Sequence, residues 1–288
     1  MKRAFVLSGG GNRGPMQVGA LQVLMDHGVI PDMLVGTSAG AINAVQLGLD
    51  PTPRGLDEMA HFWRDVLPGF TSVPSVGSMA MRYMTGRDGL VPEERWREPF
   101  AQEWSLRELR FGDYTGPRVY TVATHLLTGE PKVFGDRPEE RVLDGVLASA
   151  ALPPTFAPWY VAGEPYIDGA FCSNLPVRIA VERGADEIYA LNIVPKEETE
   201  PIHGVLNIEA RAIAQLMMRN AELELDWAAA RPGVSVHLIE LRPSIVPVLW
   251  NLDRTEEMIV EGRQAAEAWF RRYADIRLAT VRSKPAPG

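Results

Sequence analysis

Ser38 is the residue in this sequence best placed for nucleophilic chemistry. It lies in Gly36-Thr37-Ser38-Ala39-Gly40, after an apolar run typical of a strand (32–35) and before an apolar stretch typical of a buried helix (41–45). Small neighbours allow a sharp strand-to-helix turn that exposes the hydroxyl, and the free N–H groups of the helix start favour a developing negative charge. We therefore predict a nucleophile elbow. The alternative is an ordinary turn flanked by glycines.

A second motif is the glycine loop at residues 9–14, with the sequence Gly-Gly-Gly-Asn-Arg-Gly. It follows a predicted strand (3–8) and precedes a helix that starts at Pro15 and ends near Gly28. Such a loop turns several N–H groups toward one point. The spacing also fits a dinucleotide fingerprint, but that function needs an acidic residue at the end of the second strand, and Asp32 lies at its start. We favour an oxyanion hole, which would share a crevice with Ser38 if the two strands are parallel neighbours.

Asp168 is the candidate partner of Ser38. Asp-Gly is a common turn signal, so a plain turn is the simplest alternative. However, Asp168 directly follows the predicted hairpin 160–167 and so ends an apolar strand. Small residues follow it, before a helix that begins at Pro176. A carboxylate at one strand end can meet a nucleophile at another.

The rest of the chain predicts alternating helices and strands, and therefore an α/β fold. We expect helices at 56–66, 141–152, 202–230 and 255–273, and strands at 118–127, 132–134, 186–194 and 234–241. Residues 68–89 are rich in methionine and weakly periodic, which predicts either a functional lid or a pair of short core helices. The apolar loop 243–252 is predicted either to line an acyl pocket or simply to pack.

Composition narrows the function classes. The formal net charge of −8 argues against nucleic acid as a partner, and one cysteine, Cys172, excludes an intrachain disulfide. We found no stretch long enough for a membrane span and no signal peptide, so we expect a cytoplasmic protein. Residues 1–282 are expected to form a single domain, with a disordered tail at 283–288.

Taken together, these motifs resemble those of the patatin-like phospholipases. The resemblance rests on the glycine loop, the serine motif, Asp168-Gly169-Ala170 and the block of small residues and prolines at 148–158. It implies a three-layer α/β/α sandwich with a mainly parallel central sheet, and hydrolysis of acyl esters in membrane lipids, of the phospholipase A or lysophospholipase type.

The resemblance also implies the role of each site residue. Ser38 would be the nucleophile and Asp168 the base of a dyad that lacks histidine and needs no metal or other cofactor. The proposed oxyanion donors are Gly9, Gly10, Gly11 and Ala39, and the supporting loop residues are Asn12, Arg13 and Gly14. A protein of this kind would take a lipid or phospholipid substrate and make transient contact with a membrane surface, as a cytoplasmic protein peripheral at membranes.

Two other functions remain open from the sequence. One is a Ser-His-Asp esterase or thioesterase of the α/β-hydrolase type, in which the histidine follows the acid on a late loop. Of the five histidines, only His203 is placed in that way. The other is a lipid or dinucleotide carrier without catalytic activity.

Overall fold

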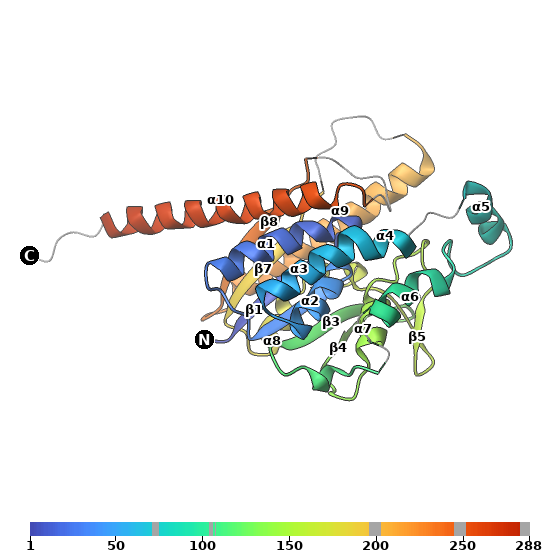
Figure 1. Ribbon diagram of the computed structural model, residues 1–288, viewed down its shortest axis with the longest axis horizontal. Coiled ribbons are helices and arrows are strands. Elements are labelled where there is room, and N and C mark those ends of the chain that lie inside the picture. The colour runs from blue at the N-terminus through green and yellow to red at the C-terminus, as the bar shows by residue number, and fades with distance from the viewer. Residues whose placement is uncertain (71–74, 104–105, 107, 196–202, 245–251, 283–288) are drawn as a thin grey trace, which may run out of the picture.

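The computed structural model describes residues 1–70, 75–103, 106, 108–195, 203–244 and 252–282. The expected tail at 283–288 and most of the apolar loop 243–252 lie outside the described residues. Within them, eight strands form one mixed sheet in the order β5-β6-β3-β2-β1-β7-β8, with β4 also paired to β3 (Figure 1). The strands are β1 (Arg3–Leu7), β2 (Met33–Thr37), β3 (Arg118–His125), β4 (Pro131–Phe134), β5 (Trp159–Val161), β6 (Glu164–Asp168), β7 (Glu187–Ile193) and β8 (Ser235–Leu241).

The centre of the sheet is parallel. β1 pairs in parallel with β2 on one side and with β7 on the other, and the parallel pairing continues to β3 and β8. β4 and β6 run antiparallel to β3, and β5 antiparallel to β6. The chain order therefore reverses at β1. In open α/β sheets, ligands bind beyond the carboxyl ends of the strands at such a point.

Helices cover both faces of the sheet, which confirms the predicted three-layer arrangement. Residues along β1 alternate between two apolar cores: Phe5 and Leu7 belong to one, and Ala4 and Val6 to the other. This two-sided burial explains why the strand is apolar throughout. The helices are α1 (Gly14–Asp26), α2 (Ala39–Leu49), α3 (Pro53–His61), α4 (Leu67–Phe70), α5 (Val76–Met84), α6 (Glu93–Glu103), α7 (Val142–Ser149), α8 (Val177–Glu182), α9 (Val205–Ala229) and α10 (Thr255–Arg282).

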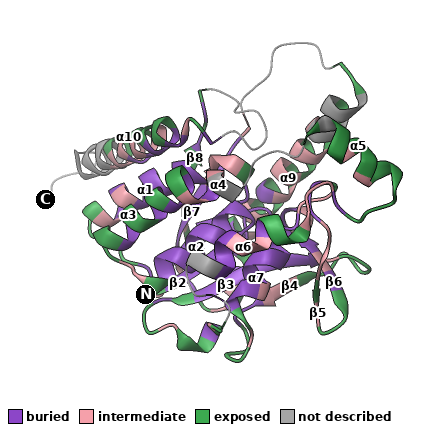
Figure 2. Cartoon of the chain, turned by 45° about the vertical axis from the view of Figure 1, so that its right-hand side comes forward, coloured by how far each residue is buried: buried purple, intermediate pink, exposed green. Residues whose placement is uncertain are grey.

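The two layers are set by which helices supply each core. Buried side chains of α1, α2, α7 and α10 join the first core, whereas those of α8 and α9 join the second. α1 and α10 lie side by side, and Figure 2 shows that their buried surfaces turn toward the sheet. None of the described helices is long and apolar enough to cross a membrane.

Several expected elements differ in extent. The helix predicted at 141–152 ends at Ser149, before the proline block, and the closing helix α10 runs on to Arg282 instead of ending near residue 273. α6 was not predicted, because its apolar spacing is weak and Pro99 lies inside it. The expectation of two short core helices within 68–89 was wrong for α5, whose side chains are largely exposed.

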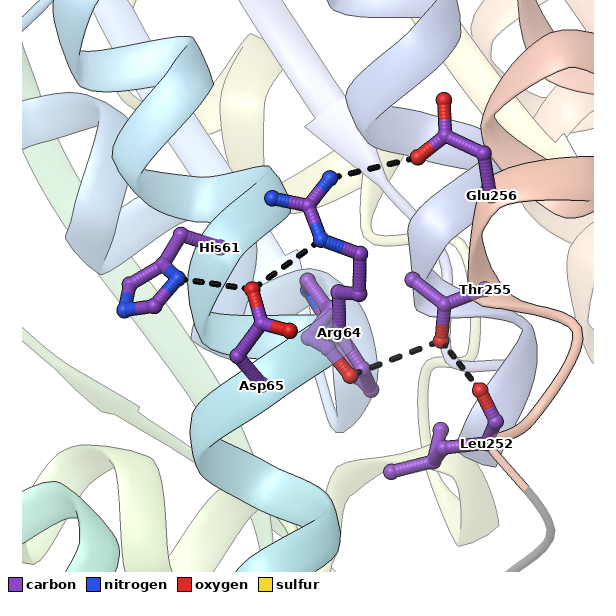
Figure 3. Close-up of polar contacts among 7 residues, drawn as sticks. His61, Arg64, Asp65, Leu252, Thr255 and Glu256 are labelled. Atoms are coloured by element: carbon purple, nitrogen blue, oxygen red, sulfur yellow. Dashed lines mark hydrogen bonds and ion pairs between the residues drawn. The ribbon is translucent and has the colours of Figure 1, made fainter.

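The start of α10 contacts the π-helical turn η2 (Phe62–Val66), which follows α3. Thr255 Oγ1 lies 3.4 Å from the Trp63 oxygen, and Arg64 Nη1 donates to Glu256 Oε2 at 3.2 Å (Figure 3). Asp65 accepts from Arg64 and also pairs with His61. The contacts of Thr255 and Glu256 thus join the last helix of the chain to η2.

Candidate active site

Ser38 occupies a sharp turn between β2 and α2. Its φ of 55° and ψ of −121° lie where residues other than glycine are rarely found. A carbon added at Gly36 would lie 2.2 Å from the Gly40 oxygen, and one added at Gly40 would lie 2.2 Å from the Leu7 oxygen. Both positions therefore require glycine, because the elbow packs backbone against backbone. Strained backbone of this kind costs on the order of 1–3 kcal/mol, and the surrounding structure must hold it in place.

Asp168 lies at the same site as Ser38, and an interaction with the Ser38 side chain is one of the effects that favour the charged form of its carboxyl group. Asp168 ends β6, where it pairs with Ala123 of β3, and Thr124 Oγ1 donates to its main-chain oxygen at 2.8 Å. The Ala170 N–H donates to Asp168 Oδ1 at 2.9 Å. The carboxylate is thus held in one orientation beside the hydroxyl.

Burial changes the acid–base character of this carboxyl group. Asp168 is 1% exposed, and desolvation raises its pKa from 3.8 to about 7, despite the opposing effects of the Ala170 N–H and the Ser38 side chain. The protein fold itself, without a bound ligand, excludes water from this carboxyl group. At neutral pH this group can therefore both accept and return a proton.

The glycine loop lies beside Ser38, but its three glycines do different things. A carbon added at Gly9 would lie 3.2 Å from Ser38 Cβ, so only glycine fits there. The Gly9 N–H donates to the main-chain oxygen of Asn174 at 3.1 Å. This bond corrects the expectation that Gly9 supplies an oxyanion donor, because its hydrogen is already used.

Gly10 and Gly11 remain as donors in the loop. In the described part of the chain their N–H groups have no hydrogen-bond acceptor, and Gly11 lies at the exposed tip with a φ of +58°. Arg13 Nε donates to the Gly10 oxygen at 2.9 Å and so fixes the direction of this peptide. Burial lowers the pKa of the Arg13 guanidinium. Asn12 and Arg13 form a single 3-10 turn with Gly11, and Gly14 begins α1 under the indole ring of Trp63.

Ser149, a residue that the sequence analysis did not single out, supports the elbow. Its Oγ accepts the Ser38 N–H at 2.9 Å and donates to the Val122 oxygen at 2.5 Å. It is fully buried at the end of α7. The signal in the sequence was the run of small residues from 148 onward, which predicted close packing but not which hydroxyl would bind the elbow.

A buried polar network ties the two motifs together. Asn43 of α2 donates to Gln17 Oε1 of α1 at 2.9 Å, and Gln17 donates to the Ser8 oxygen at 2.8 Å. Trp63 Nε1 donates to Asn43 Oδ1 at 2.7 Å. Because each group has a partner, the network fixes the glycine loop against the elbow helix.

Asn174 also lies at this site, and the sequence gave no reason to select it. It is 5% exposed, and its Oδ1 is buried without a hydrogen-bond partner among the described residues. A carbon added at Gly9 would lie 2.6 Å from this oxygen. The Asn174 side chain therefore packs against the glycine loop, and the Asn174 main-chain oxygen accepts a hydrogen bond from the same loop.

The histidines have other contacts. His27 Nδ1 lies 2.9 Å from the Val23 oxygen, and His61 pairs with Asp65 on an exposed helix face (Figure 3). His125 contacts Glu164, and His237 lies 3.5 Å from Glu187. His203, the one histidine placed as a late-loop base, is exposed ahead of α9. The carboxylate beside Ser38 accepts a hydrogen bond from the Ala170 N–H.

No group of three or more histidine, cysteine or acidic side chains suited to a metal ion occurs among the described residues. The dinucleotide interpretation of the glycine loop needs an acidic residue on the same side of the sheet as that loop. Asp32, the acidic residue considered for a dinucleotide ribose, accepts the Arg3 N–H at 2.8 Å at the amino end of β1. It lies at the opposite edge of the sheet from the glycine loop.

Comparison with known proteins agrees with this geometry. The sequence pattern of the family described as patatin-like phospholipase matches residues 5–181, which include the glycine loop, Ser38 and Asp168. The chain belongs to the patatin-like phospholipase family. This membership supports a lipid acyl hydrolase activity.

Individual relatives are distant. The chain is 26% identical over 209 residues to lysophospholipase NTE1 of Mycosarcoma maydis, covering 70% of this chain and 10% of that protein. It is 24% identical to patatin-like phospholipase domain-containing protein 7 of Rattus norvegicus, covering 68% of this chain and 14% of that protein. The chain is 29% identical to the uncharacterized NTE family protein Mb1092c of Mycobacterium bovis, covering 79% of this chain and 59% of that protein. The chain thus spans only part of these relatives.

A solved structure confirms the fold. VipD from Legionella pneumophila superimposes with a TM-score of 0.53 at 15% identity, covering 94% of this chain and 67% of that one. At this identity the likeness concerns the fold alone. The patatin-like phospholipase family and its fold are therefore shown by independent comparisons.

Proposed function

We propose that this protein is a serine acyl-ester hydrolase of the phospholipase A or lysophospholipase type, with Ser38 as nucleophile and Asp168 as general base. The observation that supports the proposal is the buried Asp168 carboxyl group beside Ser38, whose pKa desolvation raises to about 7 and whose charged form the Ser38 side chain favours. The matching family is one of phospholipases. In our proposal Asp168 activates Ser38 without help from a histidine side chain.

The reaction follows from the positions of the groups. Ser38 Oγ attacks the ester carbonyl carbon while its proton passes to Asp168. The N–H groups of Gly10, Gly11 and Ala39 stabilise the oxyanion, and the start of α2 adds its dipole. When the intermediate collapses, Asp168 gives the proton to the leaving alcohol. A water molecule then attacks the acyl-serine and loses a proton to Asp168. As the bond between the acyl carbon and Ser38 Oγ breaks, Asp168 returns this proton to Ser38 Oγ and the carboxylic acid leaves.

The substrate supplies the reason for a membrane contact. A lipid ester resides in a membrane or micelle, so the protein must visit that surface to reach its substrate. We therefore propose transient, peripheral association with membranes, as the sequence had predicted.

Active-site labelling combined with hydrolysis tests the chemistry. We expect a fluorophosphonate probe to label Ser38 and the wild-type protein to hydrolyse p-nitrophenyl butyrate and phospholipids. Ser38→Ala should abolish both, and Asp168→Asn should lower kcat by about 10²- to 10⁴-fold, as loss of a general base does. His61→Gln and His125→Gln serve as controls and should leave turnover unchanged.

Three results would contradict the proposal. Labelling at another residue would displace Ser38 as nucleophile. Loss of turnover in a single histidine variant that still folds would favour a Ser-His-Asp hydrolase. A protein that is neither labelled nor active would instead be a carrier.

A further inference from the structure

Helix α5 carries its apolar residues on the outside. In most surface helices of globular proteins, apolar residues spaced at i, i+3, i+4 and i+7 face the core. Here Gly77, Ala80, Met81 and Met84 have this spacing, and all of them are exposed. Met81 is 61% exposed, Met84 80% and the neighbouring Tyr83 79%. We call the outer surface formed by Met81 and Met84 the α5 face, and the exposed Tyr83 lies on the flank of the helix.

The helix is held in position by its other side. Met79 and Arg82, three residues apart, are its partly buried residues within the described side chains. Arg82 Nε donates to the Gly89 oxygen at 2.8 Å. The α5 face is therefore free to contact another body while α5 stays attached, and Figures 1 and 2 show the helix projecting from the end of the molecule with an exposed surface.

The segment after α5 connects it to the catalytic elbow. The Leu90 N–H donates to the Pro154 oxygen at 3.1 Å, and the Val91 N–H to the Thr155 oxygen at 2.9 Å. This strap lies on the proline block, which directly follows the helix that carries Ser149. Because Ser149 binds the Ser38 N–H, α5 is fixed relative to the elbow by a short, ordered path.

The charges around α5 differ from those of the whole chain. Residues 75–88 contain Arg82, Arg87 and Asp88, and therefore carry one more positive than negative charge, whereas the full sequence has a net charge of −8. Anionic lipid surfaces attract basic residues close to the membrane, within a Debye length. Because an anionic lipid surface repels the negatively charged molecule as a whole, the molecule would approach that surface with α5 first.

We propose that the α5 face is the membrane-docking surface of this protein, and that its partner is a phospholipid layer containing anionic lipid. Met81 and Met84 enter the boundary between head groups and acyl chains, and Tyr83, on the flank of the helix, and Arg87 lie among the head groups. Methionine side chains adapt to irregular apolar surroundings, and tyrosine suits an environment that is apolar at one end and wet at the other. This inference rests on the proposed function, since it names the surface by which that hydrolase reaches its substrate.

Vesicle binding tests the surface without requiring catalysis. All proteins carry Ser38→Ala, so that the lipid stays intact, and are sedimented with large vesicles of phosphatidylcholine alone or mixed with phosphatidylglycerol. We expect Met81→Ser/Met84→Ser to lower the partition coefficient ~10-fold or more, because burial of apolar area contributes strongly to interfacial binding. Tyr83→Ser should lower it further, and Arg87→Glu should reduce the gain from phosphatidylglycerol.

A matched control removes the same kind of side chain elsewhere. Ile30, which precedes β2, and Leu49, which ends α2, lie toward the amino edge of the sheet and are 52% and 42% exposed. Ile30→Ser/Leu49→Ser should partition like the Ser38→Ala parent. Circular dichroism of all variants should be unchanged, because each altered side chain is exposed.

The outcomes separate this inference from the proposed function. With Ser38 present, hydrolysis of dissolved p-nitrophenyl butyrate reports the catalytic proposal alone, and the α5 variants should retain it while losing activity on vesicles. Equal partitioning of the α5 variants and their parent would overturn the docking surface. A change in self-association during sedimentation velocity, with unchanged vesicle binding, would overturn it as well, since the face would then bind a second copy.

Discussion

At the scale of single residues, the site depends on how Asp168 is surrounded. It is a carboxyl group with almost no access to water, so its charged form is disfavoured, while the Ala170 N–H and the Ser38 hydroxyl stabilise that charge. Desolvation is the larger effect and raises the pKa to about 7. A carboxylate with an ordinary pKa near 3.9 is a weak base at neutral pH, whereas this one is matched to its task.

The pH dependence of turnover should show this match. Asp168 must be ionised to accept the Ser38 proton, so kcat/KM for p-nitrophenyl butyrate should rise with pH and level off above about 7. Well below that pH it should fall about tenfold per unit, as expected for a single essential base. The measurement is a pH–rate profile under conditions where the protein stays folded.

The control separates this titration from that of a histidine, whose usual pKa is about 6.5. His61→Gln and His125→Gln should keep both the midpoint and the plateau. A midpoint near 4 in the wild-type protein would mean that Asp168 is solvated in the free protein, and a midpoint that shifts in either variant would assign the titration to an imidazole.

At the scale of elements, the sequence predicts what depends on local pattern. β1, β2 and the helices after them follow from apolar runs broken by glycines, and parallel pairing brings residues 9–11 and Ser38 to one edge. The position of Asp168 does not follow from this rule, because β6 runs antiparallel to β3 and places Asp168 opposite Ala123. Contacts that join distant segments were not predictable in this way. Ser149 binds the elbow across 111 residues, and the loss of the Gly9 donor depends on where the Asn174 carbonyl lies.

The orientation of α5 also could not be predicted from the sequence. Its methionines fit a core helix and a surface helix equally well, because periodicity shows which residues share a face but not what that face contacts. The raised pKa of Asp168 could not be predicted from the sequence either, because it depends on burial by several elements at once. In each case the missing information is three-dimensional packing.

The contact between α1 and α10 makes a prediction at this scale. A carbon added at Gly19 would lie 1.9 Å from the Ile259 oxygen, and one added at Gly262 would lie 1.9 Å from the Met16 oxygen. Each helix thus uses a glycine to approach the backbone of the other. We expect Gly19→Ala or Gly262→Ala to force the helices apart and to lower the free energy of unfolding by about 1–3 kcal/mol, measured by urea denaturation.

Gly77 provides the matched control, because it also lies in a helix but a carbon added there meets nothing within 4 Å. Gly77→Ala should leave stability unchanged or raise it slightly, by about 0.5–1 kcal/mol, since alanine favours the helix. If all three variants behaved alike, the close approach of α1 and α10 would be wrong.

At the scale of the whole molecule, the fold holds a costly site in place. Ser38 follows β2, the glycine loop follows β1 and Asp168 ends β6, so three strands of one sheet supply the groups that we propose to react. The loop and Ser38 lie next to the point where strand order reverses. The strained φ of Ser38 and the buried carboxylate both oppose folding. The two apolar cores on either side of the sheet offset these costs.

The cost of the buried carboxylate should appear in the stability of the protein. Between its usual pKa of 3.8 and the folded value of about 7, Asp168 keeps its proton in the native state and loses it in the unfolded state. The free energy of unfolding therefore falls as pH rises through that window, by an amount on the order of a few kcal/mol, and this contribution is constant above the window.

Asp168→Asn keeps an oxygen for the Ala170 N–H but has no charge to bury. Its melting temperature should exceed that of the wild type by several degrees at pH 8, with the difference shrinking toward pH 4, although turnover is lost. Asp57→Asn on the exposed face of α3 should show no such trend. A difference between Asp168→Asn and wild type that does not vary between pH 4 and pH 8 would show that this carboxyl group titrates alike in the folded and unfolded chain.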